Sequence, residues 1–280
     1  PLHHLLFNNS DFVLVMTSYE LPETKKSGIF YFIMTEFGTV FLIFSFILLY
    51  NYTGSFEIES ISTIPDSLSS LIFISMLIGF GTKAGMIPFH KWLPYAHSAA
   101  PSNVSALMSG VMIKIAIYGL MRFTLQVLSP QIWWGVLILI MGTLSGILGV
   151  IYALKESDLK RLLAYLSIEN IGFILTAMGL AIIFRITGNN FLVTLAITGC
   201  LFHILNHALA KSLLFMTAGS VVNETGTRNI DKLGGIYNKM PYTSALFLVG
   251  AVSISSLPPF NGFVSKLLIF LAFFNFNAVS

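Results

Sequence analysis

The stretch Leu68–Pro94, LSSLIFISMLIGFGTKAGMIPFHKWLP, decides the fold class of this chain. Its first part is apolar enough to enter a bilayer, but the run Gly79–Pro88 interrupts it around a charged residue, Lys83. Glycine and proline at this density break a helix. A broken helix at membrane depth is tolerated only inside protein or beside a water-filled cavity. The stretch therefore indicates a membrane protein with an internal polar region.

The composition of the whole chain agrees with this interpretation. Of its 280 residues, 55% are hydrophobic and 10% are charged, and the mean hydropathy is +0.83. Soluble domains carry about 25% charged residues, so a soluble enzyme is excluded. The 14% aromatic content excludes intrinsic disorder. A single cysteine, Cys200, excludes a disulfide scaffold and cysteine-based metal clusters.

Seven segments reach the length of about 20 mostly apolar residues that a membrane crossing requires. They are Gly28–Tyr50, Leu68–Phe89, Asn103–Phe123, Ile132–Leu154, Leu162–Phe184, Phe191–Val222 and Tyr242–Ala278. A further apolar stretch, Asp11–Glu20, is too short to cross. The last segment contains Leu257–Gly262, LPPFNG, whose two prolines predict a second broken helix.

Two broken helices, one in each part of a chain, are typical of transporters built from inverted repeats. We therefore expect an all-α, polytopic transmembrane helix bundle that forms part of a larger fold. Residues 1–130 would hold the first repeat, with its break around 79–90. Residues 131–280 would hold the second repeat, with its break around 257–263.

Basic residues are distributed unevenly over the two sides of this bundle. Side A, defined by the Leu21–Ser27 loop, carries nine of them in its loops: Lys25, Lys26, Lys91, Lys155, Lys160, Arg161, Arg228, Lys232 and Lys239. Side B carries only Arg122 and Arg185. The positive-inside rule predicts that side A is cytoplasmic. The run Lys155–Arg161, KESDLKR, is interpreted as a loop on that side.

The remaining lysines lie inside predicted spans: Lys83, Lys114, Lys211 and Lys266. Each would cost about 2.5–3.5 kcal/mol at a helix centre that faces lipid, so we expect them to face protein, water or a partner. The acidic candidates at membrane depth are Glu20, Glu36 and Glu169. Lys83 and Lys266 lie close to the two breaks, where freed backbone groups form water and ion sites. Snorkelling to the interface is the alternative for both.

A stripe of titratable residues follows one face of a predicted span. His203, His207 and Lys211 are spaced i, i+4, i+8, which places them within about 80° of the helix circumference. Histidine titrates near neutral pH, so such a stripe can pass protons through water. Hydrogen bonding between neighbouring helices is the alternative. A metal site is disfavoured, because the glutamate of a zinc-protease motif is missing and Lys211 would repel a cation.

The sequence carries no motif for bond-making chemistry. It has no Gly-rich phosphate loop, no cysteine cluster and no nucleophile elbow. His203 and His207 share one helix face and could not ligate both faces of one haem. We therefore expect neither a cofactor nor a metal in this chain. His90, in an amphipathic stretch with Trp92, could gate water access to Lys83 or be an ordinary interfacial histidine.

Four stretches carry a family resemblance. They are GFGTKAGMIPFHKWLPYAHSAAPSNVSALMSGVMIKIAIYGLMR (Gly79–Arg122), DLKRLLAYLSIENIGF (Asp158–Phe173), FHILNHALAKSLLF (Phe202–Phe215) and SSLPPFNGFVSKLLIF (Ser255–Phe270). In this order they resemble the proton-translocating, antiporter-like membrane subunits of respiratory complex I and of membrane-bound hydrogenases. SIENIG (Ser167–Gly172) most resembles the hydrogenase branch, which includes hydrogenase-4 component B and formate hydrogenlyase subunit 3.

The resemblance implies a fold of fourteen helices with two inverted repeats, of which this chain matches the fifth to the twelfth. It also implies roles for individual residues. Glu20 and Lys83 match a pair thought to gate proton movement, although the segment after Glu20 is shorter here than in the family. Lys114 matches the central connecting lysine. The second relay is matched by His203, His207, Lys211 and Lys266.

The resulting hypothesis is a proton-translocating subunit of a hydrogenase-type or NADH-dehydrogenase-type redox complex in a prokaryotic inner membrane. The resemblance implies partner subunits, including other membrane subunits and a peripheral redox module with nickel–iron and iron–sulfur centres. A subunit of a sodium/proton antiporter without a redox partner is the alternative, as is a scaffold that moves no protons. The identity of the partner subunits would separate the first two.

Overall fold

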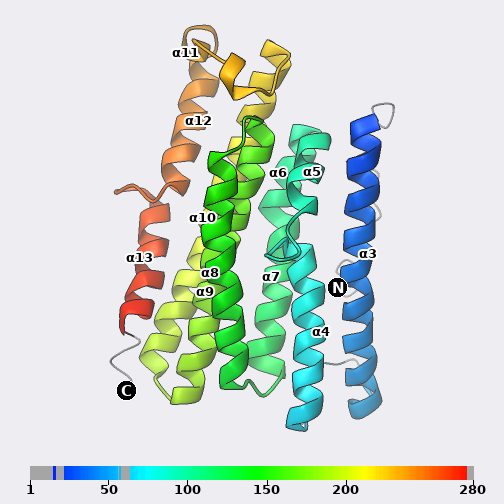
Figure 1. The fold of residues 1–280 in the computed structure, drawn as a ribbon. Coiled ribbons are helices and arrows are strands. Elements are labelled where there is room, and N and C mark those ends of the chain that lie inside the picture. The colour runs from blue at the N-terminus through cyan, green and yellow to red at the C-terminus, as the bar shows by residue number, and fades with distance from the viewer. Residues whose placement is uncertain (1–14, 17–21, 56, 58–63, 276–280) are drawn as a thin grey trace.

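The structure is a computed structural model that describes residues 15–16, 22–55, 57 and 64–275. Within these ranges the chain forms a bundle of long helices that lie side by side (Figure 1). The described part contains no β-strand, and its only β-pairing is an isolated bridge between Asp158 and Asn229. The all-α prediction is confirmed.

Six helical stretches are long and apolar enough to cross a membrane: α3 (Pro22–Thr53), α4 (Asp66–Ala84), the run Ser102–Val127, α8 (Ile132–Leu154), α9 (Leu159–Thr187) and α10 (Asn190–Thr225). The run Ser102–Val127 consists of α6 (Ser102–Leu107), the π-helical turn η3 (Met108–Met112), α7 (Ile113–Arg122) and a second π-helical turn, η4 (Phe123–Val127). The shorter elements are α5 (Trp92–Ala99), the 3₁₀ turn η5 (Ile230–Lys232), α11 (Ile236–Lys239), α12 (Pro241–Ile254) and α13 (Asn261–Phe274). The chain is an integral membrane protein.

Six of the seven spans that the sequence predicted correspond to helical stretches long enough to cross alone. The seventh is divided into α12 and α13, each of 14 residues, at the break that its prolines predicted. Both breaks lie where glycine and proline predicted them, one between α4 and α5 and the other between α12 and α13. The chain passes through the two breaks in opposite directions (Figure 1).

The first break is closed by side chains that satisfy its freed backbone groups. Gly85 ends α4 with a φ of 72°, a left-handed conformation that glycine adopts without strain. The indole Nε1 of Trp92 donates to the carbonyl oxygen of Thr82 at 2.8 Å. The backbone N–H of Ile87 donates to Ser145 Oγ on α8 at 3.0 Å. Since buried backbone groups need partners, these contacts allow the break to lie inside the bundle.

The second break is held by one pair of asparagines and one glycine. Asn206 Nδ2 on α10 donates to the carbonyl oxygen of Asn261 at 2.9 Å, and Asn261 Nδ2 returns a bond to Asn206 Oδ1 at 2.8 Å. A Cβ on Gly262 would lie 1.8 Å from the carbonyl oxygen of Ser253. The start of α13 therefore packs directly on the backbone of α12.

Helices α8 and α9 are in backbone contact through glycines spaced seven residues apart. A Cβ on Gly142 would lie 2.6 Å from Thr176 N, and one on Gly149 would lie 2.6 Å from Glu169 N. A Cβ on Gly135 would lie 2.9 Å from the carbonyl oxygen of Gly179. Small residues on the facing sides of two membrane helices let their backbones approach closely.

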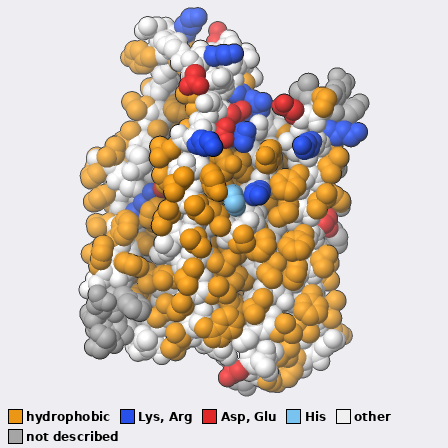
Figure 2. Space-filling view, in the orientation of Figure 1, with side chains coloured by type: hydrophobic (Ala, Val, Ile, Leu, Met, Phe, Trp, Pro, Cys, Tyr) orange, Lys and Arg blue, Asp and Glu red, His pale blue; other side chains and the backbone are white. Residues whose placement is uncertain are grey.

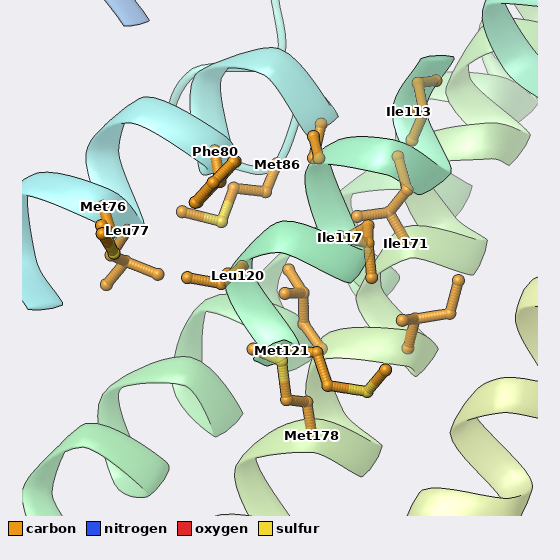
Figure 3. Close-up of a cluster of buried hydrophobic side chains, with 14 of the residues drawn as sticks. Met76, Leu77, Phe80, Met86, Ile113, Ile117, Leu120, Met121, Ile171 and Met178 are labelled. Atoms are coloured by element: carbon orange, nitrogen blue, oxygen red, sulfur yellow. The ribbon is translucent and has the colours of Figure 1, made fainter. Parts of the chain in front are cut away.

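The apolar core lies between α4, α7 and α9 (Figure 3). Met76, Leu77 and Phe80 on α4 face Ile117, Leu120 and Met121 on α7, while Ile171 and Met178 come from α9. The other labelled members are Met86, from the first break, and Ile113. The polar residues described below are therefore embedded in an apolar bundle.

Charged side chains gather at one end of the molecule, above a broad apolar belt (Figure 2). Two of the loops predicted on side A meet at the end of α5. Arg228 Nη1 donates to the carbonyl oxygen of Ser98, and Arg228 Nε pairs with Asp158 Oδ2 at 3.3 Å. Asp158 in turn caps α9 by accepting from the backbone N–H groups of Lys160 and Arg161. That side A faces the cytoplasm stays a prediction.

Lys160 corrects the interpretation of Lys155–Arg161 as a simple loop. The residue belongs to the first turn of α9 and is only 5% exposed. Its Nζ donates to the carbonyl oxygen of Ala100 at 2.8 Å. This contact cannot be predicted from the sequence, because its acceptor lies 60 residues away in the chain.

Candidate functional site

The stripe on α10 faces the interior, as its spacing predicted. His203, His207 and Lys211 are all fully buried. Helix α10 crosses the membrane between α9 on one side and α12 and α13 on the other, so the stripe lies between helices and not against lipid. Three titratable groups are thus buried along two turns of a single membrane helix.

Lys211 and His207 have different surroundings. Lys211 Nζ donates to the carbonyl oxygen of Leu163 on α9 at 2.9 Å, and this oxygen also accepts from Ser167 Oγ. Neither ring nitrogen of His207 has a hydrogen-bond partner among the described residues. The rings of His203 and His207 are nearly parallel, with centroids 6.4 Å apart. This spacing leaves the two imidazoles close but not in direct hydrogen-bond contact.

His203 is hydrogen-bonded on both ring nitrogens. Its Nδ1 lies 3.0 Å from Ser265 Oγ on α13, and its Nε2 lies 3.1 Å from Asn170 Oδ1 on α9. The ring therefore connects three helices: α9, α10 and α13. Its position is fixed by contacts that His207, one turn further along the same helix, lacks.

Lys266 forms an ion pair with Glu169. Its Nζ lies 3.3 Å from Glu169 Oε1, and the two side chains are only 10% and 15% exposed. The same ammonium lies 4.3 Å from the centroid of the Phe173 ring, a favourable cation–π distance. Glu169 was a secondary candidate in the sequence, and the structure identifies Lys266 as its partner.

Lys114 lies directly after the π-helical turn η3. Its Nζ donates to the carbonyl oxygen of Ser109, which belongs to that turn. π-Helical turns offer carbonyl oxygens with altered bonding and occur often at functional sites. Lys114 is 8% exposed and lies within electrostatic range of Lys211 and His207. The Lys114 side chain therefore lies between the helices of the first part of the chain and the α10 stripe.

Lys83 lies in the last turn of α4, next to the first break, and is 5% exposed. Glu20 lies outside the described residues, so the pairing of Glu20 with Lys83 stays a prediction. Glu36 on α3 is partly buried and forms no ion pair within the described part of the chain. His90 is buried beside the first break, where its ring stacks on that of Tyr152 at 5.8 Å.

The sequence analysis missed His97. This residue is fully buried on α5, and its ring stacks on that of Phe215 with centroids 4.5 Å apart. Neither ring nitrogen has a partner among the residues that the structure describes. It lies within electrostatic range of Lys211, Lys160 and Lys114. Helical spacing from Leu93, a buried residue of α5 four positions before His97, was the available signal.

Most of the buried basic groups form one region. Lys114 and His97 lie within electrostatic range of Lys211, and His203 and His207 lie within range of Lys266. Lys83 belongs to α4, which packs against α7, the helix of Lys114. Within the described ranges no three His, Cys, Asp or Glu side chains are close enough to hold a metal ion. The chemistry that this arrangement offers is proton binding and release by buried bases.

Comparison with known proteins places this geometry in a family context. The family model described as "NADH:quinone oxidoreductase/Mrp antiporter, TM" matches residues 10–280. The chain is 42% identical over 259 residues to hydrogenase-4 component B of Escherichia coli K12, covering 91% of this chain and 38% of that protein. It is 37% identical over 267 residues to formate hydrogenlyase subunit 3 of the same organism, covering 95% and 44%. The chain thus spans less than half the length of these relatives.

A solved structure shares the fold. The structure of the Mrp complex from Dietzia sp. DQ12-45-1b superimposes with a TM-score of 0.83 at 29% sequence identity, covering 94% of this chain and 28% of that one. The resemblance to antiporter-like membrane subunits, and to the hydrogenase branch in particular, is therefore confirmed at the level of family and fold.

Proposed function

Because the chain belongs to the NADH:quinone oxidoreductase/Mrp antiporter transmembrane family, we propose that it moves protons through its buried bases as part of a redox-driven membrane complex. The observation that carries the proposal is the α10 stripe, in which His203, His207 and Lys211 are fully buried in a membrane helix. Charged side chains at this depth are costly and mark ion or proton pathways. Their continuity with Lys114 and Lys266 supports a pathway across the bundle.

In the proposed movement, a proton passes from one buried base to the next. A proton held at Lys83 passes by Lys114 to the α10 stripe, and then to Lys266. The Glu169 carboxylate lies beside the Lys266 ammonium, so a shift of charge at one end of the pathway would act on this ion pair. Water between the groups would carry the proton where side chains do not touch, as between His203 and His207.

The names of two relatives suggest which subunits accompany this chain. The two curated relatives are named as components of a hydrogenase and of a formate hydrogenlyase. We therefore propose that other membrane subunits and a peripheral module with nickel–iron and iron–sulfur centres accompany this chain in a prokaryotic inner membrane. Those centres would reside in the partner subunits, and this chain would contribute the proton pathway alone.

The test begins with the intact complex, purified from native membranes in mild detergent. Mass spectrometry of the co-migrating subunits is expected to identify a nickel–iron hydrogenase large subunit. The complex is then reconstituted into liposomes, where hydrogen production and proton uptake are measured together. Lys83→Ala is expected to abolish proton uptake and to leave the redox reaction running in uncoupled vesicles. Loss of both activities with a normal subunit composition would contradict a role confined to the proton pathway.

A second function has support from the Mrp complex that shares the fold. An antiporter subunit would exchange protons for another cation, such as sodium, without redox chemistry. The two functions are separated by the same purification. If only antiporter-like membrane subunits co-migrate, and a sodium gradient alone drives proton movement in the liposomes, the chain is an antiporter subunit. Absence of proton movement in both assays would identify a scaffold.

A further inference from the structure

His203 is the one histidine of the α10 stripe whose two ring nitrogens both have partners in the described part of the chain. The partners come from different helices, Asn170 from α9 and Ser265 from α13. Both are almost inaccessible, Asn170 at 1% and Ser265 at 0% exposure. None of the proposed steps above assigns a role to either residue.

The Asn170 contact fixes one proton on the ring. Asn170 Nδ2 donates to the carbonyl oxygen of Leu166 at 2.6 Å, which orients the amide so that Oδ1 points to His203. An amide oxygen is an acceptor only. His203 Nε2 therefore carries a hydrogen, and Nδ1 is the nitrogen that gains or loses a proton.

The Ser265 contact can adapt to either state of Nδ1. The hydroxyl oxygen lies 3.0 Å from His203 Nδ1 and 3.1 Å from the carbonyl oxygen of Gly262. A serine hydroxyl has one hydrogen to donate and lone pairs to accept with. When Nδ1 is unprotonated, the hydroxyl donates to it. When Nδ1 is protonated, it donates to the hydroxyl oxygen, and the hydroxyl hydrogen turns to the carbonyl of Gly262.

We propose that Asn170 and Ser265 form a two-state clamp that satisfies His203 in both its neutral and its protonated form, so that proton uptake requires only the rotation of one hydroxyl group. The inference rests on the proposed function and identifies both residues as positioning residues for proton transfer. It also links His203 to the second break, because Gly262 is the second residue of α13.

The clamp lies next to the ion pair in both sequence and space. Asn170 follows Glu169, and Ser265 precedes Lys266, so both helices of the clamp also carry one member of the pair. The titratable groups that face His203 are therefore Glu169 from α9, Lys266 from α13, Lys114 from α7 and His207 on α10 itself. Protonation of His203 adds a positive charge near the ion pair of Glu169 and Lys266. The clamp keeps the imidazole ring in the same position in both protonation states.

The direct test is solid-state NMR of the complete complex in lipid vesicles, with ¹⁵N-labelled histidine. The His203 signals are assigned by subtracting the spectrum of His203→Gln. In the wild type, lowering the pH is expected to convert one neutral species, protonated on Nε2, to a doubly protonated species. A mixture of the two neutral tautomers in the wild type would overturn the clamp.

Ser265→Ala removes the rotating hydroxyl. The neutral form is expected to keep its hydrogen on Nε2, because Asn170 Oδ1 still accepts from that nitrogen. The fraction of protonated His203 at a given pH is expected to fall, because Nδ1–H then lacks an acceptor. Ser265→Cys keeps a rotating hydrogen on a weaker donor and acceptor, so its spectrum is expected to lie between those of the wild type and the alanine variant. A Ser265→Ala spectrum identical to that of the wild type would overturn the proposal.

Ser45→Ala is the matched control. Ser45 on α3 is also 0% exposed, and its hydroxyl bonds only to the carbonyl oxygen of Phe41 in its own helix. This variant undergoes the same loss of a buried hydroxyl and is expected to leave the His203 spectrum unchanged. A change as large as that of Ser265→Ala would show that the effect is general and would overturn the specific role.

Asn170→Asp tests the other half of the clamp. The new carboxylate would face Nε2–H, and a negative charge there is expected to increase the protonated fraction of His203 at neutral pH. An unchanged fraction would contradict the contact between Asn170 and the ring.

Proton transport separates this proposal from the proposed function. Ser265→Ala is expected to slow proton uptake by liposomes about fivefold, the effect of one net hydrogen bond, and to shift its pH profile. An unaltered rate and profile would overturn the role in transport. If the wild-type complex moves no protons, the proposed function fails, and the NMR spectra still decide whether the clamp exists.

Discussion

The break between α4 and α5 and the break between α12 and α13 each lie beside a buried lysine, but they are held in different ways. The first is enclosed: Met86 and Trp92 are fully buried, and contacts from α5 and α8 satisfy its backbone. The second is more open, with Leu257 at 53% exposure. One asparagine pair and the backbone contact at Gly262 connect it to the rest of the chain.

The lysines beside the two breaks, Lys83 and Lys266, also have different surroundings. Lys83 stands at the end of α4 within a closed region, whereas Lys266 is paired with Glu169 on a different helix. The first break is thus held by contacts with α5 and α8, whereas the second is joined to the bundle through α9 and α10. Four substitutions test this difference, and their expected losses of stability decrease from Gly262→Ala to Gly85→Ala.

Gly262→Ala is expected to have the largest effect on stability. The added Cβ would lie 1.8 Å from the carbonyl oxygen of Ser253, so α12 and α13 would have to separate. Overpacking against backbone should lower the free energy of unfolding by about 3 kcal/mol. The measurement is the thermal unfolding midpoint of the complex in detergent. A midpoint equal to that of the wild type would show that the second break is looser than the structure indicates.

Glu169→Ala tests the ion pair of Lys266 beside the second break. Removing the carboxylate leaves a buried ammonium without its counter-charge, which should cost about 2–3 kcal/mol, less than a completely buried pair because both side chains retain some exposure. The same unfolding midpoint reports the loss. The double variant Glu169→Leu/Lys266→Met is the control, because it removes both charges and should recover part of the stability. If it is no more stable than Glu169→Ala, the pair is not the cause.

Trp92→Phe tests how the first break is closed. The substitution keeps an aromatic ring next to Tyr31, whose ring centroid lies 5.2 Å from that of Trp92. It removes the bond to the carbonyl oxygen of Thr82, and the loss should be about 1–2 kcal/mol. Trp133→Phe is a suitable control, because that indole is 40% exposed. Equal effects of the two variants on the unfolding midpoint would argue against a closing role for Trp92.

Gly85→Ala should have the smallest effect of the four. The residue has a φ of 72°, which costs a non-glycine residue about 1 kcal/mol. The nearest atom to an added Cβ is the side-chain Cδ2 of Leu93 at 3.3 Å, and a side chain can move by a few tenths of an ångström. An effect as large as that of Gly262→Ala would remove the contrast between the two breaks.

The sequence predicted those features that depend on the order of residues along one helix. Gly79–Pro88 and Leu257–Gly262 located both breaks, and the spacing of the α10 stripe predicted its inward face. The cost of a lysine in lipid predicted that Lys114 and Lys266 would be buried. These inferences need only the helical period and the energetics of the bilayer.

Contacts between helices could not be predicted in the same way. Nothing in the sequence pairs Glu169 with Lys266, 97 positions apart, or Lys160 with the carbonyl oxygen of Ala100. His97 had no signal as clear as that of the α10 stripe, because its burial depends on how α5 rests against Phe215. Such pairings follow from the rotation of each helix about its axis, which the tertiary packing decides.

The glycine contacts between α8 and α9 have a mechanical consequence. Because backbone meets backbone at Gly135, Gly142 and Gly149, neither helix can slide or turn against the other without overlap of main-chain atoms. The hairpin therefore acts as a rigid frame, and Glu169 is fixed to it. Lys266 belongs to α13, beyond the open break. The ion pair thus connects this frame to α13, and in the proposed transport we expect any displacement to occur in α12 and α13 relative to the frame.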